Sequence, residues 1–152
     1  MNKIEISFIT INYNSSNLTI KLVDSIISQT VNLDFEIIVV DNASQNEDFQ
    51  NLCDSLNRFD QVKIIKNKIN SGFASGNMLG VNYATGRYYF FINNDCILLN
   101  NTSKILKDFL DFNQDVGVAT AKVLDNNGNY SSSYKQFPHL IKQLFGNSIQ
   151  RI

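Results

Sequence analysis

The chain has 152 residues, of which 43% are hydrophobic and 18% are charged. This composition is typical of a globular protein and excludes an intrinsically disordered one. The 13 Lys and Arg residues are balanced by 14 Asp and Glu residues, which gives a net charge of −1. Because a nucleic-acid-binding domain usually carries a basic face, this balance argues against nucleic acid as a partner.

The sequence also bears on the compartment. It contains no apolar run of the roughly 18 residues that a transmembrane segment needs, and its N-terminus lacks the pattern of a signal peptide. The two cysteines, Cys53 and Cys96, form no CxxC pair. We therefore expect a cytoplasmic protein with reduced thiols.

Short β-rich segments alternate with helical patterns along the chain. Runs of β-branched and aromatic residues predict five strands, at residues 4–11, 36–40, 62–65, 88–92 and 116–123. Apolar residues three and four apart predict the intervening helices, around Leu18–Ile27, Phe49–Leu56, Met78–Ala84 and Ile105–Leu110. Continuous apolar strands are typical of parallel sheets. The alternation therefore predicts an α/β fold, a mostly parallel Rossmann-like sheet with helices on both faces.

The ends of these elements are marked less clearly. Ser15 or Ser16 is a candidate N-cap for the first helix, and Thr102 for the fourth. Residues 125–129, Asp-Asn-Asn-Gly-Asn, predict a turn. The pattern is irregular after it, apart from a partial amphipathic helix over residues 139–152.

Polar residues follow four of the predicted strands at the point where each strand ends. These clusters are Thr10–Asn14, Asp41–Ser44, Asn70–Phe73 and Asn93–Asp95. Ligands of open α/β sheets bind outside the carboxyl ends of the strands, so we expect the clusters to meet at one edge. Their amides, hydroxyls, aromatic ring and two carboxylates suit a nucleotide with a metal ion on its phosphates.

Structural interpretations exist for the same residues. Asp41 and Asp95 are common turn or cap residues, and Asn12 and Asn14 also suit turns or helix caps. These alternatives remain open at the level of sequence.

Three glycines, Gly72, Gly76 and Gly80, recur every four residues. They would share one face of a helix, either for close packing or for the approach of the backbone to a ligand. Their spacing matches neither GxGxxG nor GxxxxGK[ST], which argues against dinucleotide dehydrogenases and P-loop NTPases. His139 is the only histidine, so a histidine-rich metal site is excluded.

Four sequence blocks resemble the N-terminal half of family-2 glycosyltransferases of GT-A fold, especially the rhamnosyltransferase-like branch. The blocks are Ile6–Asn14 (ISFITINYN), Val39–Ser44 (VVDNAS), Asn70–Gly80 (NSGFASGNMLG) and Phe91–Asp95 (FINND), in the family's order and spacing. The segment from Asp115 to Gly128 resembles the family's next strand and turn. The resemblance therefore covers nearly the whole chain.

This resemblance implies a nucleotide-sugar-binding site. Its residues would be Thr10, Asn12, Tyr13, Asn14, Asp41, Asn42, Ser44, Asn70, Gly72, Phe73, Gly76, Asn77, Asn93 and Asn94. The family's DxD metal motif is Asn93-Asn94-Asp95 here, and only its last position keeps a carboxylate. Asp95 would therefore bind a divalent cation, Mg²⁺ or Mn²⁺, with the donor diphosphate supplying further oxygens.

The resemblance also implies inverting transfer of a sugar from a UDP- or dTDP-sugar to a glycan or lipid-linked acceptor. Through such an acceptor the protein would lie at the periphery of the inner membrane. The family's catalytic base lies in its acceptor-binding half, so we expect it beyond Ile152. Residues 1–152 would form one nucleotide-sugar-binding domain, with residues 125–152 beginning the other half.

The alternative is a non-catalytic nucleotide-sugar-binding fragment or one part of a split enzyme. In that case the apolar stripe at residues 140–145 would be a surface for self-association.

Overall fold

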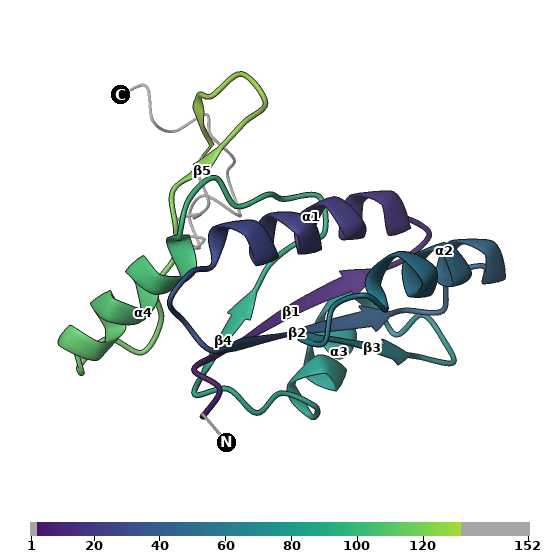
Figure 1. Ribbon diagram of the computed structural model, residues 1–152, viewed down its shortest axis with the longest axis horizontal. Helices are drawn as coiled ribbons and strands as arrows, with labels where there is room; N and C mark the ends of the chain where they lie inside the picture. The colour runs from purple at the N-terminus through teal and green to yellow at the C-terminus, as the bar shows by residue number, and fades with distance from the viewer. Residues whose placement is uncertain (1–2, 132–152) are drawn as a thin grey trace, which may run out of the picture. The chain divides into compact units, whose positions relative to one another are not determined.

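Four parallel strands form the central sheet of the computed structural model, which describes residues 3–131 (Figure 1). They are β1 (Ile6–Asn12), β2 (Phe35–Asp41), β3 (Val62–Lys66) and β4 (Tyr88–Phe91). Their order across the sheet is β3-β2-β1-β4. The register pairs Asn12 with Asp41, so the polar ends of the two central strands lie side by side.

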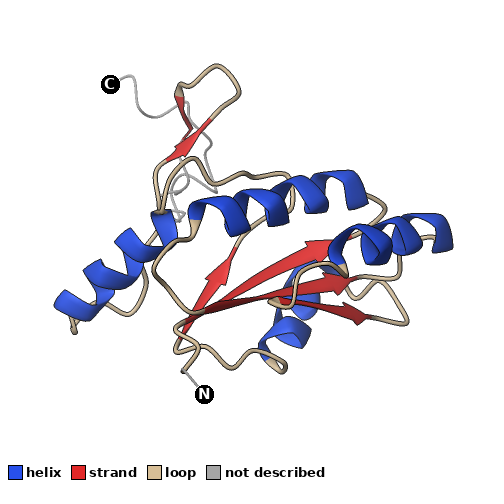
Figure 2. Ribbon diagram, in the orientation of Figure 1, coloured by secondary structure: helices blue, strands red, loops and turns tan. Residues whose placement is uncertain are grey.

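Helices cover both faces of this sheet (Figure 2). They are α1 (Ser16–Gln29), α2 (Asn46–Leu56), α3 (Gly72–Val81) and α4 (Thr102–Phe112). Alternate residues of β1 face opposite sides. Phe8 packs with the α1 and α2 residues Leu22 and Leu52, whereas Ile9 packs with Leu79 of α3. The predicted α/β fold with a mostly parallel sheet and helices on both faces is confirmed.

Glycines bring α3 close to the sheet. A Cβ atom on Gly80 would lie 2.6 Å from Ile9 Cγ2, and one on Gly76 would lie 2.8 Å from Ile11 Cδ1. Ordinary carbon contacts are about 3.5–4.0 Å, so close packing accounts for both glycines. Gly72 differs, because its φ of +78° favours a residue without a Cβ.

Two helices differ from the sequence prediction, one in its first residue and the other in the residues that it buries. The helix α3 begins at Gly72, six residues before the predicted stripe, because its buried face consists of small residues rather than of large apolar ones. In α1 the buried face includes Thr19, whereas Leu18 is exposed.

The predicted helix caps also need correction. Ser15 occupies the N-cap position of α1, but its hydroxyl makes no capping hydrogen bond. Thr102 is the first residue of α4, and its N-cap is Asn101.

The predicted fifth strand at residues 116–123 is wrong. Within residues 3–131, only the end of this segment pairs, as β5 (Val123–Leu124) with the antiparallel β6 (Tyr130–Ser131). Val118 is 86% exposed. A run of valines forms a strand only where a neighbouring strand accepts and donates its hydrogen bonds, which periodicity does not reveal. The predicted turn is confirmed, since Asp125 accepts hydrogen bonds from the backbone N–H groups of Asn127 and Asn129.

The chain divides into two compact units, residues 1–119 and 120–152. The first holds the parallel sheet and its helices, and the described part of the second holds β5 and β6. The helix expected over residues 139–152 lies outside the described residues, and the single domain over the whole chain stays a prediction. In the described part of the chain, every helix is too short or too polar to span a membrane.

Candidate functional site

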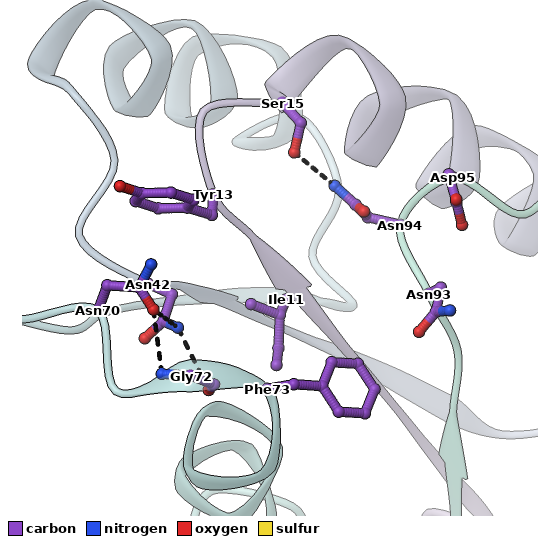
Figure 3. A pocket seen from close by; sticks show the side chains of 10 residues that line it. All are labelled: Ile11, Tyr13, Ser15, Asn42, Asn70, Gly72, Phe73, Asn93, Asn94 and Asp95. Atoms are coloured by element: carbon purple, nitrogen blue, oxygen red, sulfur yellow. Dashed lines mark hydrogen bonds between the residues drawn. The ribbon is translucent and has the colours of Figure 1, made fainter.

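A cavity of about 460 Å³ lies at the carboxyl end of the parallel sheet (Figure 3). Its wall is formed by Ile11, Tyr13, Ser15, Asn42, Asn70, Gly72, Phe73, Asn93, Asn94 and Asp95. All four polar clusters that follow strands in the sequence contribute to this wall. The sheet topology produces this convergence, because parallel strands end at the same edge.

The predicted site residues fall into two groups. Those in the wall are Tyr13, Asn42, Asn70, Gly72, Phe73, Asn93, Asn94 and Asp95. Those outside the wall are Thr10, Asn12, Asn14, Asp41, Ser44, Gly76 and Asn77. Most of the second group is buried. The side chains of Asn12, Asp41, Ser44 and Asn77 hydrogen-bond to the protein and so support the wall from behind, whereas the buried Thr10 hydroxyl has no partner among the described residues.

Two aromatic rings face the cavity. Tyr13, in the loop between β1 and α1, is 49% exposed, and Phe73, in the first turn of α3, is 66% exposed. Figure 3 shows them on separate parts of the wall. Exposed rings of this kind offer a surface on which a planar base can stack.

Asn42 shapes the wall between these rings. It is almost fully buried, and its amide nitrogen donates to Asn70 Oδ1 (2.8 Å) and to the Gly72 carbonyl (3.3 Å). Its amide oxygen accepts from Asn67 Nδ2 and from the Ser71 backbone N–H, both at 3.2 Å. These bonds fix the loop that leads into α3, so the side chain positions the wall rather than facing a ligand.

Asn12 and Asp41 form a buried polar centre behind the wall. The Asn12 amide nitrogen lies 3.0 Å from Asp41 Oδ1, 3.1 Å from Ser44 Oγ and 2.8 Å from Asp48 Oδ2. Asp41 Oδ2 accepts from the Ser44 backbone N–H at 3.2 Å, and Asp41 has no exposed surface. Direct contact of Asp41 with a ligand would require this turn to open.

Asp48 links this centre to α1. Its second oxygen accepts the Ser16 backbone N–H at 2.9 Å, one of the donors that a helix N-terminus leaves without a partner. Burial raises the pKa of Asp48, but the hydrogen bonds from Asn12 and Ser16 outweigh it and hold the pKa below its usual value. Asp48 therefore caps α1 from another helix, which explains why the Ser15 hydroxyl is not used as a cap.

The segment Asn93–Asp95 forms the side of the cavity next to β4. Asn93 and Asp95 are exposed, whereas Asn94 is partly buried. The Asn94 amide nitrogen donates to Ser15 Oγ at 2.7 Å and to Thr19 Oγ1 at 3.0 Å. Among the described residues that line the cavity, Asp95 is the only carboxylate.

The oxygen atoms beside the cavity determine which kind of divalent-cation site the chain can form. Within residues 3–131, no three His, Cys, Asp or Glu side chains gather into a metal site. Mg²⁺ is commonly held by one or two carboxylates together with substrate phosphates. A single exposed carboxylate beside a cavity fits that mode of binding, and does not fit a site made by the protein alone.

Sequence reasoning missed several residues of this region. Thr19 and Asp48 belong to the polar centre, and Ser15 and Ile11 to the wall. Thr19 had a usable signal, because it is a polar residue on the same helical face as Leu22 and Ile26. Asp48 had none, since an acidic residue in the first turn of a helix is common.

Comparison with known proteins places the chain among enzymes of one kind. A model of the family described as Glycosyl transferase family 2 matches residues 7–151. The chain is 29% identical over 122 residues to an "Uncharacterized glycosyltransferase" of Rickettsia bellii, and the aligned region covers 80% of this chain and 17% of that protein. It is 27% identical over 135 residues to a poly(ribitol-phosphate) beta-glucosyltransferase of Bacillus spizizenii, and the aligned region covers 87% of this chain and 21% of that protein. The chain thus spans about a fifth of the length of these curated relatives.

Solved structures show the same likeness. S. aureus TarS 1–349 in complex with UDP-GlcNAc matches with a TM-score of 0.62 and 25% identity, over 73% of this chain and 32% of that chain. The mannosyltransferase PcManGT from Pyrobaculum calidifontis, solved with GDP-Man and Mn²⁺, matches with a TM-score of 0.61 and 18% identity, over 70% of this chain and 32% of that chain. At 18% identity the second likeness is one of fold alone. With the family match, these structures confirm the predicted GT-A-like fold.

Proposed function

The chain belongs to glycosyl transferase family 2, and on this basis we propose that its cavity binds the nucleoside diphosphate of a sugar donor. The observation that carries the proposal is that residues from all four strand ends line one cavity. This is the edge at which open α/β sheets bind nucleotides. Support comes from TarS, a protein of similar fold at 25% identity that was solved with UDP-GlcNAc.

The two sides of the cavity suit different parts of such a donor. Tyr13 offers an exposed ring face for the nucleobase. Asn70, Gly72 and Phe73 form the wall that we assign to the diphosphate and the sugar. Asn93 exposes an amide that can hydrogen-bond a ribose hydroxyl or a phosphate oxygen.

Asp95 is the residue that we assign to a divalent cation, Mg²⁺ or Mn²⁺. When bound, such an ion neutralises charge on the departing diphosphate. The role of Asp95 is to hold the cation at one end of the cavity, and the cation in turn binds the diphosphate. Because the chain supplies one carboxylate there, binding of metal and of nucleotide should depend on each other.

For the whole protein we propose inverting transfer of the sugar to a glycan or lipid-linked acceptor, from a UDP-sugar or, following the rhamnosyltransferase-like pattern, a dTDP-sugar. The acceptor oxygen forms a bond to the anomeric carbon, the bond to the diphosphate breaks, and a base takes the acceptor proton. Since Asp95 is the only carboxylate in the described wall and is assigned to the cation, the base would come from outside this wall. Because the described wall offers no second carboxylate that could act as the base, a second candidate is a unit that binds the donor without turnover.

A panel of thermal-shift measurements tests donor binding. The chain is mixed with UDP, dTDP, GDP or CDP, each with Mn²⁺ and with EDTA. A ligand at about 100 times its Kd stabilises the folded state by roughly 2.7 kcal/mol, which gives a measurable shift. We expect one or two of these nucleotides to raise the melting temperature, and to raise it further with Mn²⁺. A cooperatively melting sample that shifts with none of them would refute the proposal.

A matched pair of variants tests the role of Asp95. Asp95→Asn removes the negative charge at nearly constant shape, and Asp108→Asn does the same at an exposed site on α4, outside the cavity wall. We expect Asp95→Asn to lose the additional shift produced by Mn²⁺ and to keep the shift produced in EDTA. Asp108→Asn should keep both. An unchanged Mn²⁺ effect in Asp95→Asn would contradict the assignment.

A further inference from the structure

We propose that Asn94 is a positioning residue, whose side-chain amide ties the Asn93–Asp95 segment to α1 and so fixes Asp95 at the cavity. This role rests on the donor site proposed above. It assigns Asn94 to the protein side of the wall rather than to the nucleotide, and it is carried by the hydrogen bonds around the end of β4.

The sheet alone does not hold this segment. Within residues 3–131, the strand β4 lies at the edge of the sheet and pairs with β1 alone, from Tyr88 opposite Ile6 to Phe91 opposite Ile9. One further backbone bond joins Ile92 N–H to the Ile9 carbonyl at 3.1 Å. The next backbone bond is local, from Cys96 N–H to the Asn93 carbonyl. Asp95 therefore lies past the end of the ladder, where its position depends on side chains.

The chain returns to α1 at the buried Leu98, three residues after Asp95, where the Leu98 N–H donates to Ser25 Oγ at 3.0 Å. Asn94 supplies the connection directly before Asp95. Its amide nitrogen donates to Ser15 Oγ (2.7 Å), at the N-cap of α1, and to Thr19 Oγ1 (3.0 Å), in the first turn of this helix (Figure 3 shows the bond to Ser15). An amide has two N–H donors, so both are used. Among the described residues, in contrast, the Asp95 carboxylate accepts one side-chain hydrogen bond, a weak one from the thiol of its neighbour Cys96 at 3.6 Å.

The direction of these bonds requires a donor at position 94. Thr19 is fully buried, and its hydroxyl donates to Asn12 Oδ1 at 2.8 Å. Thr19 Oγ1 can therefore only accept from position 94. An amide satisfies it, whereas a carboxylate at the same place would set oxygen against oxygen. The bonds thus run in one direction, from Asn94 through Thr19 and Asn12 to Asp48.

Ser15 provides a way to cut the connection without damaging α1. It stands at the N-cap of α1, yet its hydroxyl makes no capping bond, and the Ser16 N–H is capped by Asp48. Replacing Ser15 with alanine should therefore remove one bond to Asn94 and leave the helix capped. A cycle of Asn94→Ala, Ser15→Ala and the double variant then isolates the contribution that passes between the two residues.

The first test is isothermal titration of the full chain with UDP and with dTDP, in Mn²⁺ and in EDTA. Loss of a residue that orients a metal ligand typically costs about 10–100-fold in metal affinity. We expect Asn94→Ala to reduce the gain in affinity produced by Mn²⁺ by about tenfold, a larger factor than any change that it causes in EDTA, because Asn94 also lines the cavity. Ser15→Ala should have a smaller effect, and the double variant should match Asn94→Ala.

Three results of this titration would overturn the proposal. An equal loss of affinity in Mn²⁺ and in EDTA would mean that Asn94 contacts the nucleotide itself. A larger gain from Mn²⁺ in Asn94→Asp than in the wild type would mean that position 94 is a metal ligand. A lower melting temperature with an unchanged Mn²⁺ effect would leave Asn94 a purely structural residue.

A second test does not need a ligand, so it separates this proposal from the proposed function. In hydrogen-exchange measurements on the unliganded chain, we expect Asn94→Ala to accelerate exchange of the amides in residues 93–97 and to leave those of α3 unchanged. Unchanged exchange in residues 93–97 would overturn the role of Asn94, whatever the chain binds. Failure of the wild type to bind any nucleotide, with accelerated exchange in Asn94→Ala, would instead refute only the donor site.

Discussion

A single methyl group at Gly80 tests how closely α3 packs on the sheet. A Cβ atom there would lie 2.6 Å from Ile9 Cγ2 and 3.3 Å from Val40 Cγ2. Both methyl groups are attached directly to the Cβ of β-branched residues that are fully buried. They cannot rotate away as the end of a long side chain would, so α3 must move outward by several tenths of an ångström or more.

Two opposing terms set the size of the effect. Overpacking a well-filled core typically costs about 1–3 kcal/mol. Alanine within a helix is favoured over glycine by about 1 kcal/mol. Because the contact at 2.6 Å is with a methyl group that cannot move aside, we place the overpacking cost in the upper part of its range, about 2–3 kcal/mol. After subtraction of the helix preference, Gly80→Ala should lower the free energy of unfolding by roughly 1–2 kcal/mol. At Gly76 the nearest atom is Ile11 Cδ1, the mobile end of a partly buried side chain, so Gly76→Ala should cost less.

Urea denaturation of the two variants, monitored by far-UV circular dichroism, checks this order. Gly117→Ala is the control, because a Cβ atom there has no neighbour within 4 Å in the described structure, and its effect should be within about 0.5 kcal/mol. Unfolding free energies for Gly80→Ala equal to or above that of the wild type would refute the close packing. So would a larger loss at Gly76 than at Gly80.

Two further predictions concern the cavity and the base of the sheet. Tyr13→Ala should weaken UDP binding by roughly 5- to 150-fold, because stacking on an aromatic ring contributes about 1–3 kcal/mol, whereas Tyr13→Phe should keep most of the affinity; equal losses in the two variants by calorimetry would contradict stacking. For Glu36, burial raises the pKa, but hydrogen bonds from Ser7 and Thr85 outweigh it and hold the pKa below the ordinary 4.5. Because the pKa is lower in the folded state, the resulting stability is present above about pH 4.5 and is lost as the pH falls through the folded-state pKa. Glu36→Gln should therefore destabilise the protein at pH 7 and flatten its acid dependence in urea titrations, and curves that stay parallel down to pH 3 would contradict this origin.

The sequence predicts the sheet and its helices because burial dominates both. The runs that became β1 and β2 are mostly apolar, and the structure buries most of their residues. The same reasoning fails at residues 116–123, where Val118 is exposed. Apolar character indicates a tendency to pair, but whether a partner strand is present is a property of the whole fold.

The candidate site is predictable at the level of its location and not of its individual contacts. Tyr13 follows β1 directly and Asp41 is the last residue of β2, and both carry polar groups, yet one faces the cavity and the other is buried. Asp41 is held inside by the ladder opposite Asn12, whereas Tyr13 lies beyond the ladder. The turns after the two strands contain Asn14 and Ala43, with positive φ values of 50° and 65°. Asparagine is enriched in this conformation and alanine is not, so the sequence indicates a turn near Asn14 but gives no such signal at Ala43 and does not show which side chains face inward.

The orientation of Asp41 and Asp48 explains how acidic residues can lie next to the proposed site for an anionic diphosphate. Asp41 and Asp48 would repel a diphosphate if their carboxylates faced it. Both are instead turned toward Asn12, and their oxygens accept hydrogen bonds from amides, so their charge is satisfied within the protein. Among the described residues that line the cavity, only Asp95 presents a carboxylate, and there a negative charge is useful, because a cation can join it to the diphosphate. The asparagines of this region therefore have two roles. Asn12 donates hydrogen bonds to the buried carboxylates and Asn42 shapes the wall, and Asn94 positions Asp95, the carboxylate that the described wall presents to the cavity.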